Sequence, residues 1–374
     1  MKRVSVAMIG LVTTGLATTG LLATAGCAVS HDVGVSDDGQ PSALTGPTEL
    51  SERCRKDVAD SPFGLPKNLS CTGLYADSDA SSQTISDGVL EFAPQYLLWS
   101  DGLNKSRWLF LPKDSQIDAT NSGQWVFPVG TRVWKEFRSP DEDKPVETRI
   151  YYKKGESDWV QNSYQWNDGL TEALRVDSAK DVELGSQTHW IPGPSDCNDC
   201  HKGRRDRVLG FEQVSLGLEK ASGVTLEQLV AEERLKGFEG PTSYKIGEGK
   251  DDGTEAHALG WIHMNCGVTC HNDNTNATGK SIDMRLRLEP TLLDGRPAAE
   301  FPTITTTVGQ DTQALQWSGR KRITAGSAAD SWLYSLITQR GDEKNQMPPI
   351  GTRLVDEQDS AVVKKWIESL PKAN

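Results

Sequence analysis

The sequence predicts an α+β protein in which an N-terminal antiparallel β-sheet or sandwich is followed by a small all-α domain. Two observations favour this class. Short runs of aromatic and β-branched residues, separated by turn-forming residues, recur between residues 51 and 210. After Gly210 the apolar residues instead recur at helical spacing. At 374 residues, the chain is long enough for two compact domains and a tail.

Residues 1–26 have the pattern of a lipoprotein-type signal peptide. Two basic residues precede an apolar run without acidic residues, and the run ends in Ala25-Gly26-Cys27. Ala-Gly before Cys is typical of the bacterial lipoprotein cleavage site, so Cys27 is the candidate lipid attachment site. The alternative is simple cleavage near Ala25, which gives a soluble product. Residues 27–50 are poor in apolar side chains and predict a flexible tether. We therefore expect an exported protein, periplasmic or attached to the outer membrane through its lipid.

The predicted β-rich domain covers residues 51–210 and ends in a Cys/His motif. Its aromatic runs alternate polar with apolar residues, and turns such as Ser100-Asp101-Gly102 separate them. This pattern predicts an antiparallel sheet or sandwich. The expected strand runs are Tyr96–Trp99, Arg107–Leu111, Gln124–Phe127, Arg132–Phe137, Thr148–Tyr152 and Trp159–Val160.

Helices are expected in the last third of the chain. Residues 211–254 predict a helical connector, in which Thr225 and Gln228 have the spacing of a capping box for a helix to about Lys236. Residues 255–374 predict the small all-α domain. The helices expected there are 257–265, 331–339 and 356–370, the last with Asp356 as its N-cap.

Charge and cysteine content narrow the function. The formal net charge is −12, with acidic and basic residues interspersed, so we expect no nucleic-acid partner. We find no local spacing typical of a hydrolase triad or carboxylate pair. Of the seven cysteines, Cys54 and Cys71 stand apart, and in an oxidising compartment they are expected to form a disulfide. Four others form two close pairs, each followed by His.

The first pair has the c-type haem attachment pattern, Cys-x-x-Cys-His, at Cys197, Cys200 and His201. Two thiols at this spacing can each form a thioether with one porphyrin, and the adjacent imidazole then becomes the proximal iron ligand. A zinc site would need four ligands, and a thioredoxin-like redox pair would need a strand-to-helix context. We therefore predict covalently bound haem c, and hence iron, at this motif.

The second pair has one more spacer residue, with Cys266, Cys270 and then His271. The extra residue still permits attachment of a second haem, but a disulfide between Cys266 and Cys270 is the alternative. About 75 residues later, Met347 precedes two prolines in a predicted loop. A Met in such a loop can give its thioether to the open face of the iron, which raises the reduction potential and suits electron transfer. We therefore expect iron ligands at His201, His271 and Met347.

These motifs carry a family resemblance. Residues 255–374 resemble a small monohaem cytochrome c domain, and residues 71–374 resemble a family of exported bacterial di-haem c-type cytochromes. The resemblance implies electron transfer through two haems. In that family the second motif normally has two spacer residues, so this sequence departs there. The turn at Phe127–Thr131 is also similar to the β-sheet cytochromes that oxidise hydroxylamine, in which the haem keeps an open iron face. The stretches that resemble the di-haem family are Leu98–Gly102, Gly123–Thr131, Glu147–Arg149, Cys197–His201 and Asn265–Asn272.

Three functions follow as hypotheses. The leading one is an electron carrier with redox partner proteins. In it the iron of the first haem has a sixth ligand, for which the candidates are His189, His257, His263 and Met264. The second is a haem enzyme whose open first iron acts on a small nitrogenous or peroxide substrate. The third is a non-redox surface lipoprotein whose Cys/His motifs are disulfides or metal sites.

Overall fold

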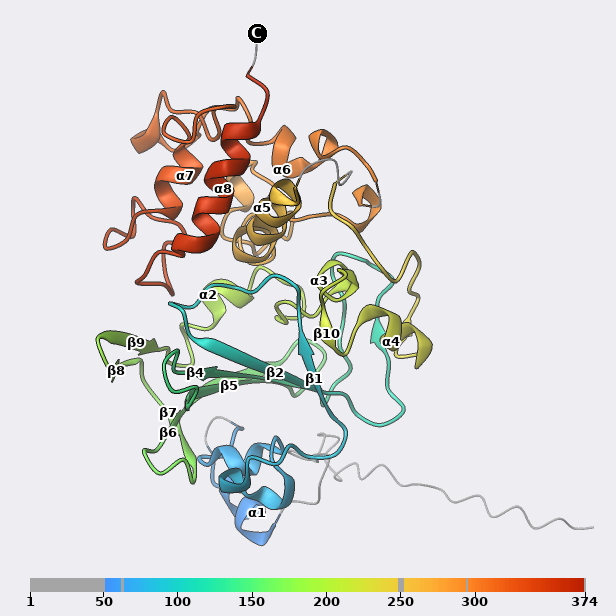
Figure 1. Ribbon diagram of the computed structural model, residues 1–374. Helices are drawn as coiled ribbons and strands as arrows, with labels where there is room; N and C mark the ends of the chain where they lie inside the picture. Colours follow the sequence, from blue (N-terminus) through green and yellow to red (C-terminus); the bar gives the residue numbers. More distant parts are fainter. Residues whose placement is uncertain (1–50, 62–63, 248–251, 294, 373–374) are drawn as a thin grey trace, which may run out of the picture. The chain divides into compact units, whose positions relative to one another are not determined.

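A seven-stranded antiparallel sheet forms the centre of the computed structural model (Figure 1). The structure describes residues 51–61, 64–247, 252–293 and 295–372. The strand order is β10-β1-β2-β4-β5-β6-β7. Two small sheets pair β11 with β3 in parallel and β8 with β9 as a hairpin. The strands are β1 Val89–Ala93, β2 Asn104–Phe110, β3 Ile117–Asp118, β4 Arg132–Arg138, β5 Pro145–Lys153, β6 Trp159–Trp166, β7 Ala173–Val176, β8 Lys180–Leu184, β9 Gln187–Ile191, β10 Ser222–Gly223 and β11 Leu235–Lys236.

One face of the sheet packs against α1 (Glu52–Ala59). Side chains alternate between the two faces of a strand, so Trp134 and Ile150, which are register partners on β4 and β5, share this face. They form a buried cluster with Val58 of α1. The helix begins at Ser51, whose hydroxyl accepts the Cys54 N–H, and the expected disulfide between Cys54 and Cys71 is present beside it.

The opposite face of the sheet supports the C-terminal helices, as Figure 1 shows. Phe92 of β1 and Leu109 of β2 belong to the same buried cluster as Trp366 of α8. The short helix α2 lies between the sheet and these helices. The sheet and the helices therefore share one hydrophobic core. The helices are α2 Asn198–His201, α3 Gln213–Gly217, α4 Leu226–Ala231, α5 Thr254–Ile262, α6 Pro302–Thr305, α7 Trp332–Ile337 and α8 Glu357–Ser369.

The mixed α+β class is confirmed, and the β-rich part is an antiparallel sheet with helices against it, not a sandwich of two sheets. Two predicted strand runs were wrong. Tyr96–Trp99 is irregular because the Trp99 N–H is taken by the Asn265 side chain. Gln124–Phe127 makes only an isolated bridge, and the Phe127 N–H donates to the carboxylate of Asp206.

Helix starts were predicted better than helix ends. The Thr225 hydroxyl caps α4 by accepting the Gln228 N–H, and Asp356 caps α8 by accepting the Asp359 N–H. However, α4 ends at Ala231 and not near Lys236, because the chain turns into β11. The Gln228 side chain also reaches forward to Glu232, so only half of the capping box forms.

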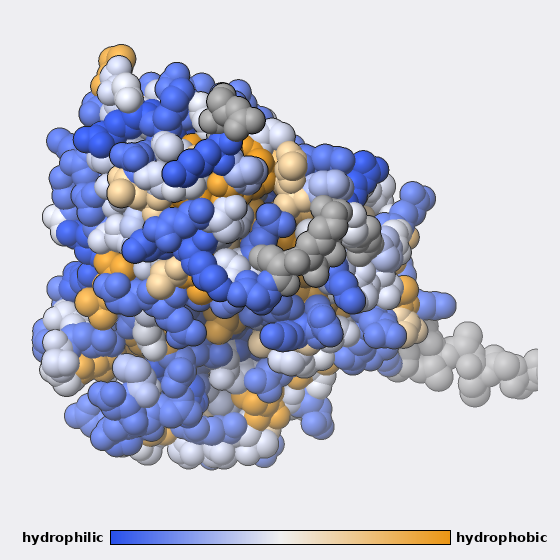
Figure 2. Space-filling model, turned by 45° about the horizontal axis from the view of Figure 1, so that its top comes forward, coloured by the Kyte–Doolittle hydropathy of each residue, from blue (hydrophilic) through white to orange (hydrophobic). Residues whose placement is uncertain are grey.

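The visible surface is mainly hydrophilic, with small hydrophobic patches (Figure 2). Among the residues described, there is no helix with both the length and the apolar character needed to cross a membrane. The expected signal peptide at 1–26, the lipid site at Cys27 and the tether at 27–50 lie outside the described residues.

Candidate functional site

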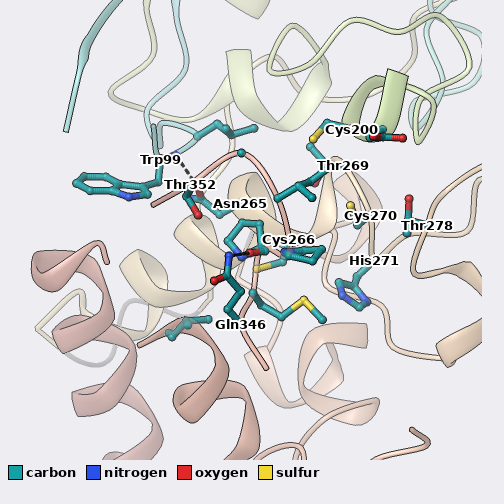
Figure 3. A pocket seen from close by; sticks show the side chains of 18 of the residues that line it. Trp99, Cys200, Asn265, Cys266, Thr269, Cys270, His271, Thr278, Gln346 and Thr352 are labelled. Atoms are coloured by element: carbon teal, nitrogen blue, oxygen red, sulfur yellow. Dashed lines mark hydrogen bonds between the residues drawn. The ribbon is translucent and has the colours of Figure 1, made fainter. Parts of the chain in front are cut away.

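Both Cys/His motifs line a single cavity of about 1000 Å³ between the sheet and the C-terminal helices. Cys197, Cys200 and His201 contribute one part of its wall, and Cys266, Cys270 and His271 contribute another, together with Met347. Figure 3 shows Cys200, Cys270 and His271 around this space. Pockets for one small molecule have volumes of roughly 300–1,000 Å³, so this cavity is at the upper end of that range.

The imidazole of His201 is oriented for ligation through Nε2. Its Nδ1 is 2.5 Å from the carbonyl oxygen of Arg207, to which it donates. The ring of Tyr151, on β5, stacks on it with centroids 4.1 Å apart. Burial lowers the pKa of His201 to about 3, so the ring is neutral and Nε2 keeps its lone pair. A backbone acceptor at the second ring nitrogen is the usual support of a metal-ligating histidine.

A buried ion pair holds the segment after the first motif against the sheet. The Lys153 ammonium lies 2.7 Å from the carboxylate of Asp206, and both side chains are almost fully buried. The same carboxylate accepts the indole N–H of Trp159 at 3.1 Å and the Phe127 N–H at 2.5 Å. The position of Arg207, and through it the orientation of His201, is therefore tied to β5 and β6. Nothing in the sequence indicated Asp206, because its partners are far away along the chain.

The extra residue of the second motif is absorbed by the backbone. In the first motif the His201 N–H donates to the Cys197 carbonyl, four residues earlier, at 3.2 Å. In the second motif the His271 N–H donates to the Cys266 carbonyl, five residues earlier, at 2.8 Å. The i→i+5 bond is of the π-helical type, which takes up one additional residue per turn. Both motifs are thus closed by the same bond from the His N–H to the first Cys carbonyl.

The π-helical geometry starts before the motif. α5 continues directly into a π-helical turn at His263–Gly267, which contains Cys266. The carbonyl of Leu286 would lie 2.5 Å from a Cβ at Gly267, so only glycine fits there. Nothing in the sequence indicated the π-helical turn that ends at Gly267.

His271 is a buried histidine with an unused ring nitrogen. Its pKa is lowered to about 4, chiefly by burial, so the ring is neutral. In the part of the chain that the structure describes, Nδ1 of His271 has no hydrogen-bond partner. The ring lines the cavity beside Cys270 (Figure 3). Gly279 lies against this nitrogen, where a Cβ would be 2.7 Å from Nδ1, so Nδ1 is enclosed by the chain while the residue as a whole lines the cavity.

The two motifs touch each other through their backbones. A Cβ at Gly203, two residues after His201, would overlap the carbonyl oxygen of Thr269 in the second motif. The thiols of Cys200 and Cys270 are close enough for their charges to interact. Only glycine allows this approach, and groups bound at the two motifs would therefore be neighbours.

The four motif cysteines are free thiols, so the alternative disulfide between Cys266 and Cys270 is not formed. Burial raises the pKa of Cys200 to about 11 and that of Cys266 to about 12. Reactive redox cysteines have pKa values lowered to about 3.5–7.5, so these thiols are unlike a thioredoxin-type pair. Within the described ranges, no three His, Cys, Asp or Glu side chains converge on a metal-ion site.

The Trp99–Asp101 segment connects the sheet to the helical part. The Asp101 carboxylate accepts the backbone N–H groups of Arg353 and Leu354, both at 2.9 Å. The Trp99 indole donates to the Leu354 carbonyl at 2.9 Å, and the Trp99 N–H donates to the Asn265 side chain at 2.7 Å (Figure 3). We call these contacts the Asp101 clip. It holds the residue before Cys266 and the loop after Met347 together.

The structure brings one of the four candidate sixth ligands to the cavity. His189, on β9, lines it. His257 is bound to Asp359 at 2.8 Å, and Met264 packs against Gly210. Both ring nitrogens of His263 are occupied, Nδ1 by the Leu288 N–H at 3.0 Å and Nε2 by Glu212 at 3.3 Å.

Glu147 connects His189 to the sheet. Its carboxylate accepts two bonds from Arg149, at 2.6 and 2.9 Å, and lies 2.8 Å from Nε2 of His189. Burial opposes ionisation of this carboxyl, but Arg149 and His189 outweigh it and lower the pKa of Glu147 to about 2. In the sequence, Glu147–Arg149 indicated only a resemblance to the di-haem cytochrome family, and no role of these side chains could be predicted.

A depressed carboxyl pKa predicts a specific pH dependence. Between pH 4.5 and about 2, the unfolded chain binds a proton at Glu147 that the folded protein does not. The free energy of unfolding should therefore fall as the pH decreases through this window, by about 3 kcal/mol from this group. Denaturant unfolding from pH 6 to pH 2 measures it. The Glu147→Gln variant should lose this part of the slope, and an identical slope in both proteins would contradict the assignment.

Comparison with known proteins gives no assignment. No family model, no curated protein and no solved structure matches this chain.

Proposed function

We propose that this protein is an exported c-type cytochrome that transfers electrons through two covalently bound haems, one at each Cys/His motif. The observation that carries the proposal is the common closure of the two motifs, in which the His N–H binds the first Cys carbonyl. Because the second motif reaches this closure despite its extra residue, its backbone is closed in the same way as that of the first. Both units face the same cavity.

The residues present fit haem c. Cys197 and Cys200 would hold the first group through thioethers, with His201 below the iron, and Cys266, Cys270 and His271 would hold the second. Burial keeps both imidazoles neutral, as iron ligation requires. When bound, haem supplies a one-electron iron couple whose potential depends on its axial ligands and surroundings. The Arg207 carbonyl oxygen holds the His201 imidazole, and His271 is only 7% exposed.

Residues 255–374 are proposed to form a small cytochrome c domain. Its supports are the packing of α5 on α8, where the Trp261 indole donates to Asp356 at 3.0 Å, and the position of Met347 in the cavity wall. The Met347 N–H donates to the Leu336 carbonyl of α7 at 2.9 Å, which ties the loop to the helices. The resemblance to exported di-haem cytochromes supports the same assignment.

A haem enzyme is the second candidate function. The observation that favours it is the state of His189, the one sixth-ligand candidate that lines the cavity, whose Nε2 is already bonded to Glu147. A first iron without a sixth protein ligand would bind a small nitrogenous or peroxide substrate.

Export, lipidation at Cys27 and redox partner proteins belong to the same proposal. The disulfide between Cys54 and Cys71 is compatible with an oxidising compartment. The disulfide fits a protein that folds outside the cytoplasm, where covalent haem attachment takes place.

Production of the full chain in a bacterium with cytochrome c maturation tests the proposal. The mature protein should weigh more than its polypeptide and acyl chains by two haems, and a pyridine haemochrome assay should give two haems per chain. Two low-spin irons would support the carrier, and a high-spin iron would support the enzyme. A mass equal to that of the lipidated or unlipidated polypeptide alone would refute both.

Met347 is expected to ligate the second iron. Replacing Met347 with Leu keeps the side-chain volume but removes the thioether, so the weak red absorption of Met-ligated ferric haem should disappear and the potential should fall. Visible spectra and redox titration measure both. Met284→Leu is the matched control, since Met284 also lines the cavity. If the band is lost in Met284→Leu and kept in the Met347 variant, then Met284 and not Met347 is the iron ligand.

A further inference from the structure

A row of cations crosses three strands on the cavity side of the sheet. Lys135 of β4 is the register partner of Arg107 of β2 on one side and of Arg149 of β5 on the other. Directly opposed residues project from the same face of a sheet, with Cβ atoms roughly 5 Å apart. Lys135 and Arg149 line the cavity. We call Arg107, Lys135 and Arg149 the cation row.

The three positive charges of the cation row are only partly balanced by neighbouring carboxylates. Arg149 is paired with Glu147, whose carboxylate is also shared with His189. Lys135 lies 4.8 Å from the ring centroid of Phe137, and no carboxylate of the described residues pairs with it. Arg107 is only 6% exposed, and its Nη1 atom has no hydrogen-bond partner in the residues the structure covers. Among the described residues, Lys135 and Arg107 therefore have no ion-pair partner, and Glu147 acts on Lys135 without a direct contact.

Such an arrangement is unfavourable without a ligand. Like charges directly opposite each other destabilise a sheet, and a buried unpaired charge is costly. Accordingly, burial and the neighbouring Arg107 and Lys105 lower the pKa of Lys135 well below its ordinary value. The Lys105 ammonium itself donates to the Leu98 carbonyl at 2.6 Å and gives no compensation. An anion in the cavity beside Lys135 and Arg149, with Arg107 on the next strand, would offset this positive charge.

We infer that the cation row is an oxyanion-binding site beside the first Cys/His motif. Lys135 and Arg149 are close enough for their charges to act on Cys200 and His201, so the bound group lies next to the first haem site. The ligand chemistry is a carboxylate or similar oxyanion, which a planar guanidinium and an ammonium bind by charge-assisted hydrogen bonds. Two sources have this chemistry: the propionates of the haem at the first motif, or a free small oxyanion.

Binding of haem propionates at the cation row rests on the proposed function, whereas binding of a free small oxyanion does not. The test therefore begins with the haem content of the purified protein, so that a missing haem is detected separately. The variant is Lys135→Met, which keeps an unbranched side chain and removes the charge. Lys135→Arg is the conservative variant, and Lys180→Met, at an exposed position on β8, is the matched control.

Two measurements distinguish the sources. Calorimetric titration with nitrite, sulfate and formate at low ionic strength detects a free anion. Lys135→Met should weaken such binding at least about tenfold, while the arginine and control variants retain it. If the wild-type protein binds none of these anions because propionates fill the site, the propionate bending bands in the resonance Raman spectrum should shift in Lys135→Met only. Unchanged spectra together with no anion binding by the wild-type protein would overturn the inference.

Discussion

Replacing Cys197 and Cys200 together with alanine is expected to lower the covalent haem content from two per chain to one. The thioethers of the first haem would have no sulfur, whereas the second motif keeps Cys266, Cys270 and His271. Intact-mass measurement and a pyridine haemochrome assay on the exported protein give the haem number directly. The reciprocal variant, in which Cys266 and Cys270 are replaced, should also retain one haem.

The reciprocal variant decides the role of the irregular motif. If this variant keeps the mass and absorbance of two haems, the second motif does not attach haem. The common backbone closure of the two motifs would then be unrelated to haem attachment. Replacing Cys54 and Cys71 is the control for thiol loss in general. That disulfide lies beside α1, on the sheet face opposite the C-terminal helices, so its removal should leave the haem number unchanged. Its loss should still cost stability, by about 3 kcal/mol for a loop of this length.

A Gly203→Ala substitution is expected to give the largest loss of stability from a single methyl group. The new Cβ would overlap the carbonyl oxygen of Thr269, which is a backbone atom and cannot rotate away. The two motif segments must separate, so the free energy of unfolding should fall by about 3 kcal/mol. Denaturant unfolding of the purified protein measures this change.

Gly169→Ala is the matched control, because the nearest atoms to a Cβ there are at 3.8 Å, which is ordinary contact. That variant should be neutral or slightly stabilising. In the haem-loaded protein, separation of the motifs in Gly203→Ala should also weaken the interaction between the two irons, seen as a smaller separation of their midpoint potentials. Equal stability of the two alanine variants would show that the motifs are not packed as closely as Gly203 and Thr269 indicate.

Local patterns in the sequence predicted the parts of the fold that depend on near neighbours. The alternation in Arg132–Phe137 predicted β4, and the run of β-branched and aromatic residues in Thr148–Tyr152 predicted β5, which is buried almost throughout. The caps at Thr225 and Asp356 were predicted from side chains that bind amides three residues away. The Cys/His spacings likewise identified the residues that meet in the cavity.

Features that depend on register or on distant partners could not be predicted in this way. Lys135 has the alternation of an ordinary strand residue, and only its pairing with Arg107 and Arg149 reveals a row of charge. Asp101 belongs to a turn sequence, and its role depends on backbone amides about 250 residues later, at Arg353 and Leu354. The partners of Lys135 and Asp101 are brought to them only by the folded chain.

The π-helical closure of the second motif has a consequence for how such sites are recognised. A search for a fixed two-residue spacer passes over the Cys266–His271 segment, although the backbone N–H of His271 binds the carbonyl of the first cysteine just as in the regular motif. Insertion of one residue is tolerated because the wider turn changes its pitch locally while α5 before it keeps its α-helical path. Backbone pairing, more than residue count, is then the better criterion for comparing Cys/His segments of unequal length.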